Sequence, residues 1–411
     1  MIFLRLLTGS VVALLVLSAC SSVKEELKPV ELQPIEAKYR MVQDWHRSTG
    51  VGQDSRYERL QPAVLNDVIY TVDVEGNVAA WRADSGKRLW HNDLDLEIGG
   101  GIGVIDGTGF VGTLDGKLVA INLKDGTLKW QAKTSSEVVS VPQANSDVVI
   151  VQSIDGRVFA FDVDDGTLRW NYDHPAPVLS LRSNSSPLIS NDNAFIAFDN
   201  GQILSFACAD GQLRWSARVG QPKGKTELER LVDVDAAPIE LGPYIYGAGY
   251  NTRLVAISKG TGRIAWGQEI STANNIASAD NAIIVSDADS HVSAFDASNG
   301  TLLWQNKELH RRNLTAPVVL GNVVLAVDGQ GYIHGLSLAD GSLVTRSRIS
   351  EERVLAQPFV IGETVYVLDT SGLMVAYQLE PHDGPISIWD MPTDREHGAI
   401  PTKYTGVKKA Q

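Results

Sequence analysis

The segment DGRVFAFDVDDGTLRW, residues 155–170, holds the pattern that decides the fold. An Asp-Gly pair opens it, a short apolar run follows, and a second Asp-Gly comes ten residues after the first. The strand after that second pair carries Trp170. Asp-Gly supplies the positive φ of a tight hairpin turn, so the segment predicts two neighbouring strands, each entered through such a turn.

The same frame recurs along the chain. The other copies are EGNVAAWRADSGKRLW (75–90), DGKLVAINLKDGTLKW (115–130), NGQILSFACADGQLRW (200–215), NTRLVAISKGTGRIAW (251–266), DSHVSAFDASNGTLLW (289–304), the weaker QGYIHGLSLADGSLVT (330–345) and the partial SGLMVAYQLE (371–380). Their successive tryptophans lie 38 to 51 residues apart. A period of about 40 residues made of short strands and turns is typical of the blades of a β-propeller.

Each frame follows a β-rich run such as 148–151, and a short strand, often at a proline, opens each unit. Four strands per unit and eight units predict an all-β, eight-bladed β-propeller over residues 39–384. Trp45 has no frame before it, and the eighth frame has no Trp strand after Glu380. We therefore expect the N-terminal strand, around 41–45, to complete the eighth blade. The repeated tryptophans are expected to pack each outer strand against the next blade.

The N-terminal segment has the pattern of an export signal. Arg5 precedes an apolar stretch of 14 residues, which is too short for a spanning helix, and small residues stand directly before Cys20. This resembles the lipobox of bacterial lipoproteins. The resemblance implies a signal peptide at 1–19, a lipid on Cys20, and, because Ser21 follows, residence at the outer membrane facing the periplasm. A plain secretory signal is the alternative.

Two further segments lie outside the repeat. Residues 20–38 carry charges and prolines without apolar periodicity, so they are expected to form a flexible tether behind the lipidated cysteine. Residues 385–411 are polar and contain Pro392 and Pro401, which predicts a flexible C-terminal tail.

Composition argues against several functions. The formal net charge of −13, without a basic cluster, excludes nucleic acid as a favoured partner. The match to GxGxxG at 107–112 follows a turn and enters a strand, which does not suit a dinucleotide site. No HExxH or GxSxG is present, and Cys208 is expected to be a small packed residue. We therefore expect no catalytic residues, no metal site and no cofactor.

The repeat is interrupted by two long connections. They run from Trp170 to Pro187 and from Trp215 to Pro238, at the same topological place in adjacent blades. They are therefore expected to emerge side by side on one face. The first contains PVLSLR and the second ERLVDVD, and exposed leucine beside arginine and aspartate is typical of a protein–protein contact. Merely long loops with inward leucines are the alternative.

The lipobox, the Trp-ended repeat and these two loop motifs together resemble the BamB family, the propeller lipoproteins of the bacterial β-barrel assembly machinery. The resemblance covers the mature chain to about Glu380. It implies a non-enzymatic scaffold that binds the periplasmic POTRA region of BamA, beside other subunits of the BAM complex. The residues that the family pattern assigns to this contact are Leu179, Leu181, Arg182, Asp233 and Asp235. Unfolded outer-membrane proteins, paired with blade edges as added strands, are a further expected partner.

Thr345 in place of tryptophan, and the tail, depart from that pattern. Two other functions stay open. The repeat also resembles the quinoprotein dehydrogenases, although those enzymes carry adjacent paired cysteines, a calcium site and a longer chain. A propeller lipoprotein that binds another periplasmic partner is the third interpretation.

Overall fold

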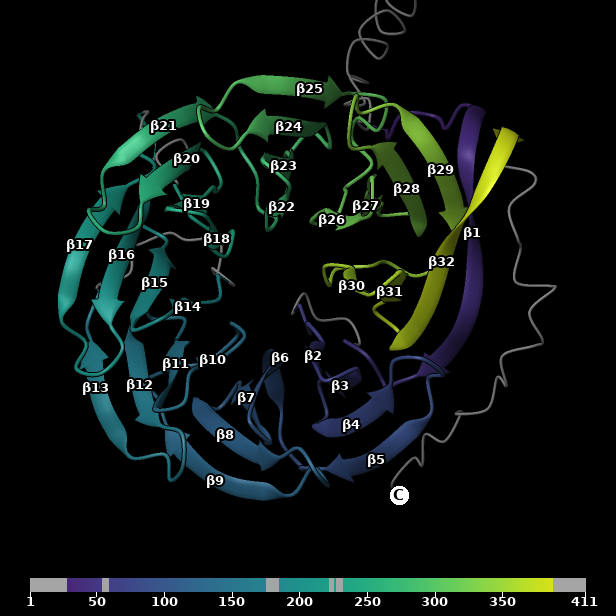
Figure 1. Cartoon of the computed structure of the whole chain (residues 1–411). Coiled ribbons are helices and arrows are strands. Elements are labelled where there is room, and N and C mark those ends of the chain that lie inside the picture. The colour runs from purple at the N-terminus through teal and green to yellow at the C-terminus, as the bar shows by residue number, and fades with distance from the viewer. Residues whose placement is uncertain (1–27, 54–58, 175–184, 222–224, 227–231, 387–411) are drawn as a thin grey trace, which may run out of the picture.

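A computed structural model describes residues 28–53, 59–174, 185–221, 225–226 and 232–386. Within these ranges the regular structure is entirely β, in eight antiparallel sheets of four strands arranged around a ring (Figure 1). This confirms the predicted eight-bladed propeller. None of the described segments forms a helix long and apolar enough to cross a membrane.

The blades are numbered along the chain, and their strands are given from the ring centre outward. Blade 1 comprises β2 (Ala63–Leu65), β3 (Val68–Val72), β4 (Asn77–Arg82) and β5 (Arg88–Asp93); blade 2 comprises β6 (Ile98–Ile105), β7 (Thr108–Thr113), β8 (Lys117–Asn122) and β9 (Leu128–Lys133). Blade 3 comprises β10 (Gln143–Ala144), β11 (Val148–Gln152), β12 (Val158–Asp162) and β13 (Leu168–Tyr172); blade 4 comprises β14 (Leu188–Ser190), β15 (Asn193–Phe198), β16 (Gln202–Ala207) and β17 (Leu213–Arg218). Blade 5 comprises β18 (Ile239–Leu241), β19 (Tyr244–Gly247), β20 (Arg253–Ser258) and β21 (Ile264–Glu269); blade 6 comprises β22 (Ala277–Ala279), β23 (Ala282–Ser286), β24 (Val292–Asp296) and β25 (Leu302–Asn306). Blade 7 comprises β26 (Val318–Leu320), β27 (Val323–Val327), β28 (Tyr332–Ser337) and β29 (Leu343–Arg348); blade 8 comprises β30 (Phe359–Ile361), β31 (Thr364–Leu368), β32 (Leu373–Ile386) and β1 (Ile35–Ser48).

The N-terminal strand closes the ring, as predicted. β1 pairs antiparallel with β32, from Ile35 opposite Ile386 to Ser48 opposite Leu373. The pair is longer than expected, because it extends past both boundaries that the sequence placed, at 39 and 384. The first residues of β1 alternate, with Ile35 and Ala37 buried and the residues between them exposed, so this stretch is a strand rather than tether.

A joint between tryptophan and glycine links neighbouring blades. Trp130 Nε1 donates to the Val163 carbonyl of the next blade at 3.0 Å, and its ring covers Gly166. A Cβ built on Gly166 lies 2.6 Å from Trp130 Cε3, so only glycine fits there. The other joints are Trp45–Gly86, Trp90–Gly126, Trp170–Gly211, Trp215–Gly262, Trp266–Gly300 and Trp304–Gly341. The predicted packing role of these tryptophans is confirmed.

The apolar core lies between adjacent sheets rather than in one central mass. One cluster joins Ile150 and Ala160 of blade 3 to Ile196 and Phe206 of blade 4, and clusters of the same kind lie around the ring. The GxGxxG match forms a turn followed by strand β7, as expected, and no helix follows it. The close packing of sheets therefore explains these residues without a bound nucleotide.

We predict that Gly166→Ala destabilises the ring far more than Gly107→Ala. Both glycines have positive φ, 74° and 77°, so both substitutions incur about 1–2 kcal/mol of backbone strain. Only at Gly166 does the new methyl meet the indole, which adds about 1–3 kcal/mol of overpacking, whereas the Cβ at Gly107 has open space. Urea unfolding followed by circular dichroism measures both, and equal losses would show that the joint is unimportant.

Candidate protein-interaction site

One face of the ring carries every connection from the outer strand of a blade to the inner strand of the next. We call it the crossover face. The described ends of the two long connections, 173–187 between β13 and β14 and 219–238 between β17 and β18, lie on it because each blade repeats the same four-stranded order. Their described ends are neighbours, since Ser185 Oγ donates to the Ala236 carbonyl at 3.4 Å. The predicted side-by-side placement therefore holds for these ends.

The structure describes only some of the residues assigned to partner binding. Leu179, Leu181 and Arg182 lie outside the described residues, as does Cys20. Asp233 and Asp235 are described, and both are buried.

Asp233 and Asp235 belong to the base of the second long connection. Their exposed fractions are 0% and 8%, and the whole stretch 232–236 is buried. Asp233 also forms a backbone bridge with Tyr250, with N–H···O distances of 3.2 and 2.7 Å. The sequence suggested an exposed acidic pair; instead, alternation of these residues with buried Val232 and Val234 draws the stretch inward.

Asp235 lies in an electrostatic cluster that the sequence analysis missed. Its pKa is raised to about 6, chiefly by burial; Arg59 opposes this shift, and the Asp199 carboxylate adds to it. Burial lowers the pKa of Arg59, against the attraction of Asp235. Arg59 precedes blade 1, whereas Asp235 precedes blade 5, so their attraction links segments that are distant in the chain.

Asp199 is the second residue of this cluster, and the turn that contains it explains why its carboxylate is not used within that turn. Three residues before the turn glycine, most blades place a polar residue that accepts N–H groups of its own turn. Asp73, Asp328 and Asp369 do so, and Asp287 does so before Ser290. In blade 4 that position is Phe198, and Asn200 accepts from the Gln202 N–H at 3.1 Å.

Asp199 therefore has no capping task. Its Oδ1 is buried without a hydrogen-bond partner among the described residues, and burial raises its pKa to about 6. Phe198 packs instead on the His174 ring, with centroids 4.3 Å apart, at the start of the first long connection. The shift of aspartate by one place relative to Gly201 is visible in the sequence, and it is the signal that could have identified this residue.

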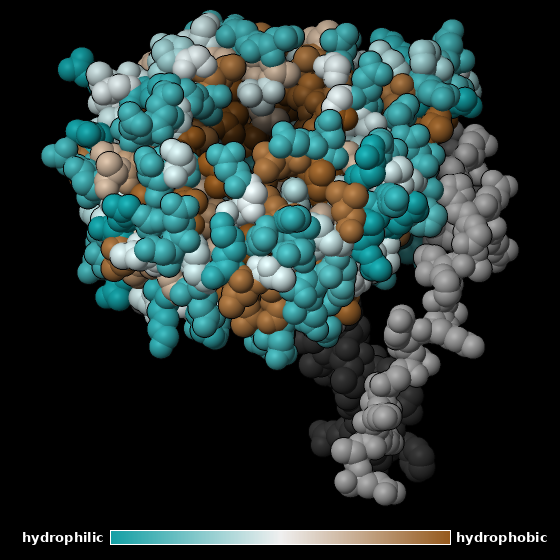
Figure 2. Space-filling view, turned by 60° about the horizontal axis from the view of Figure 1, so that its bottom comes forward, coloured by the Kyte–Doolittle hydropathy of each residue, from teal (hydrophilic) through white to brown (hydrophobic). Residues whose placement is uncertain are grey.

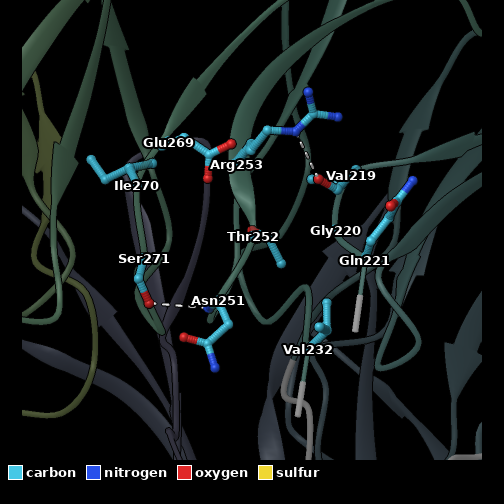
Figure 3. Close-up of a pocket in the computed structure, with 10 residues that line it drawn as sticks. All are labelled: Val219, Gly220, Gln221, Val232, Asn251, Thr252, Arg253, Glu269, Ile270 and Ser271. Atoms are coloured by element: carbon cyan, nitrogen blue, oxygen red, sulfur yellow. Dashed lines mark hydrogen bonds between the residues drawn. The ribbon is translucent and has the colours of Figure 1, made fainter. Parts of the chain in front are cut away.

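A groove opens between blades 4 and 5 beside the second long connection (Figure 3). It encloses about 870 Å³ and is lined by Val219, Gly220, Gln221, Val232, Asn251, Thr252, Arg253, Glu269, Ile270 and Ser271. Arg253 Nε donates to the Val219 carbonyl at 3.4 Å, and the Asn251 N–H donates to Ser271 Oγ at 3.1 Å. A mixed lining of polar groups, an arginine, a glutamate and Ile270 suits a polypeptide partner.

The centre of the ring is hollowed, and apolar residues surround the hollow (Figure 2). A cavity of about 330 Å³ lies there, with Arg59 among its lining residues. Gln61 Nε2 donates to the Gln357 carbonyl at 3.0 Å and Gln61 Oε1 accepts from the Gln357 N–H at 2.9 Å, while Asn275 Nδ2 donates to Gln357 Oε1 at 3.2 Å. These amides satisfy one another, so they hold the inner strands together.

Comparison with known proteins gives a consistent family. A family model described as "Outer membrane protein assembly factor BamB" matches residues 74–306 and 288–396. The BamB of Escherichia coli strain K12 is 34% identical over 328 residues, covering 77% of this chain and 84% of that protein. The crystal structure of BamB from Moraxella catarrhalis is similar with a TM-score of 0.76 and 26% identity, covering 82% of this chain and 99% of that chain.

The fold is also shared with enzymes. Quinohemoprotein alcohol dehydrogenase from Comamonas testosteroni matches with a TM-score of 0.65 at 13% identity, covering 82% of this chain and 76% of that chain. At this identity the similarity extends to the fold alone.

We predict that Asp199→Asn stabilises the protein above pH 6. The folded carboxyl has a pKa of about 6 against an ordinary 3.8, so the folded state binds more protons and unfolding becomes easier as pH rises between about 4 and 6. Removing the charge should recover on the order of 1–3 kcal/mol at pH 8 and less at pH 5. Thermal midpoints at both pH values test this, with the exposed turn variant Asp164→Asn as control. A variant that gains nothing at pH 8 contradicts the assigned environment.

Proposed function

Because the chain belongs to the BamB family of outer membrane protein assembly factors, we propose that it is a non-enzymatic scaffold subunit of the bacterial β-barrel assembly machinery. In this proposal a lipid on Cys20 holds it at the outer membrane, facing the periplasm, and it binds the POTRA region of BamA. The observation that supports this best is the meeting of the two long connections on the crossover face.

A rigid base beneath those connections supports a binding role. Recognition loops work best when a stiff scaffold presents them, because less conformational entropy is lost on binding. The backbone bridge of Asp233 with Tyr250 fixes the second connection to blade 5. Since Asp233 and Asp235 are buried, we propose that they position this connection, whereas Leu179, Leu181 and Arg182 of the first connection contact the partner.

The groove between blades 4 and 5 extends the proposed surface. Ile270 offers apolar area, Arg253 and Glu269 offer charge, and Gln221 and Asn251 offer hydrogen-bonding groups. Non-obligate interfaces mix apolar and polar area in this way. A partner that reaches the second connection lies beside this groove, so its edge can enter it.

We predict that changing Leu179, Leu181 and Arg182 together to Ala abolishes co-purification with BamA. Loss of such anchors typically costs several kcal/mol, which corresponds to more than a tenfold loss of affinity. The matched control is Leu302→Ala with Leu303→Ala, since these leucines are 49% and 53% exposed on the outer strand of blade 6. Undiminished capture of BamA by the loop variant, with the control also intact, would refute the interface.

We predict that Cys20→Ser moves the protein from the membrane fraction to the soluble periplasmic fraction. A thiol is needed to receive the lipid, and the several acyl chains of such a lipoprotein give lasting anchorage. Cys208→Ser is the control, because Cys208 is buried in the core and should leave fractionation unchanged. If the wild-type chain is itself soluble, residues 1–19 are a plain secretory signal.

The residues of the ring do not fit the calcium-dependent quinone centre that the dehydrogenase alternative requires. Among the described residues, no group of three or more His, Cys, Asp or Glu could hold a metal ion. Burial raises the pKa of Cys208 to about 11, so its thiol is not a ready nucleophile at neutral pH. Saturable binding of pyrroloquinoline quinone with calcium, followed by dye reduction, would reinstate the enzyme. A pull-down from solubilised membranes distinguishes BamA from another periplasmic partner.

A further inference from the structure

The junction between blades 7 and 8 lacks the joint of tryptophan and glycine. Thr345 occupies the tryptophan position on β29, and its buried Oγ1 has no hydrogen-bond partner among the described residues. Ten residues after the turn Gly372, where other blades place the second glycine, the chain has His382. An apolar cluster that includes Val327 and Val375 packs between these two blades, but their outer strands lack the joint found at the other junctions.

Residues 28–34, which we call the strap, lie against blade 7 before the chain enters β1. Arg312 Nη1 donates to the Val30 carbonyl at 2.8 Å, and Arg346 Nη1 donates to the Gln33 carbonyl at 2.7 Å. Both contacts use the backbone of the strap, so they do not depend on its side chains.

Two further contacts hold the strap. The Val30 N–H donates to the His310 carbonyl at 3.1 Å, on the connection that leads from blade 6 to blade 7. Leu32 packs against the apolar cluster that contains Leu309 and Leu314. The strap therefore spans blades 6 and 7 and leads directly into the outer strand of blade 8.

A buried polar network orients the two arginines. Arg312 Nε donates to Asp328 Oδ2 at 2.6 Å, and its Nη2 donates to Gln330 Oε1 at 2.6 Å. His334 Nε2 donates to the same Asp328 Oδ2 at 2.8 Å, and Arg346 Nε donates to His334 Nδ1 at 3.1 Å. Arg312, Arg346, Asp328 and His334 are 4%, 3%, 0% and 0% exposed.

The hydrogen bonds of the two buried guanidiniums are not all satisfied without the strap. Burial lowers the pKa of His334, so the ring stays neutral, and Asp328 contacts Arg312 directly but is linked to Arg346 only through His334. Buried cations are costly unless every N–H finds an acceptor. The carbonyls of Val30 and Gln33 supply two of the acceptors, so release of the strap leaves both arginines incompletely bonded.

We propose that the strap closes the junction between blades 7 and 8 and that Arg312 and Arg346 hold it in place. We call this arrangement the latch. It replaces the missing joint by holding the chain to blade 7 just before that chain forms the outer strand of blade 8. The latch is independent of the proposed partner, because its contacts are made within the chain.

Hydrogen–deuterium exchange of the full chain tests the latch. In the wild type, the Val30 amide should exchange slowly, because it donates to the His310 carbonyl. In Arg312→Met with Arg346→Met, that amide should exchange at least tenfold faster, and β1 should lose protection, while blades 2 to 5 stay unchanged. Arg348→Met is the matched control: it lies on the same strand, pairs with Glu351 at 3.7 Å, and should leave the strap protected.

A second pair of variants acts from the side of the strap. Leu32→Asp should release the strap without touching the arginines. Gln33→Ala should have little effect, because its carbonyl binds Arg346 and its side chain makes only one exposed hydrogen bond, of 3.4 Å, to the Glu31 carbonyl inside the strap. If the double arginine variant does not fold, Leu32→Asp alone decides. Fast exchange of the strap in the wild type, or unchanged protection in Leu32→Asp, would overturn the proposal.

Discussion

The structure depends on one contact made seven times, the seating of an outer-strand indole on a glycine of the next blade. The indole N–H finds a backbone carbonyl beyond that glycine, so a large apolar ring is buried with its polar atom satisfied. Because the contact joins one blade to the next, its repetition requires that the last blade meet the first. Trp45 on β1 makes that final contact with blade 1, and the ring closes through it.

The fold could be predicted because its determinants are local. Turn glycines and tryptophans recur at fixed spacings within each repeat. The turn requires a residue with positive φ, and the packing of the indole requires a glycine in the next blade. The ends of β1 and β32 were misplaced because Ile35 and Ala37 are buried between exposed polar residues, and a composition averaged over the segment hides a period of two. Pairing over such a distance in the chain is decided by tertiary packing rather than by local preference.

The candidate site was only partly accessible to sequence reasoning. Spacing alone located the two long connections, since extra residues must emerge where a regular meander is interrupted. Burial of Asp233 and Asp235, and the coupling of Asp235 to Arg59 and Asp199, arise from segments far apart in the chain. The role of Asp199 was indicated locally by its displacement of one residue from the position that caps the turn in other blades. No local feature of the sequence indicated the role of Arg59. The proposed interaction face thus combines two connections whose positions follow from the sequence with a charged base that only the folded ring assembles.

The strap also determines how the protein bears mechanical load. A force applied to the segment that precedes Lys28 reaches Val30 and Gln33 before it reaches Ile35. The hydrogen bonds from Arg312 and Arg346 to these two residues therefore bear the force first. The ladder between β1 and β32 is therefore spared until the strap lets go. A ring suspended by its N-terminus would otherwise be pulled at its own closing strand. Along residues 28–48, the strap is held first and the closing strand β1 follows it. The contacts that bear a force on the N-terminus are therefore separate from the contacts that close the ring.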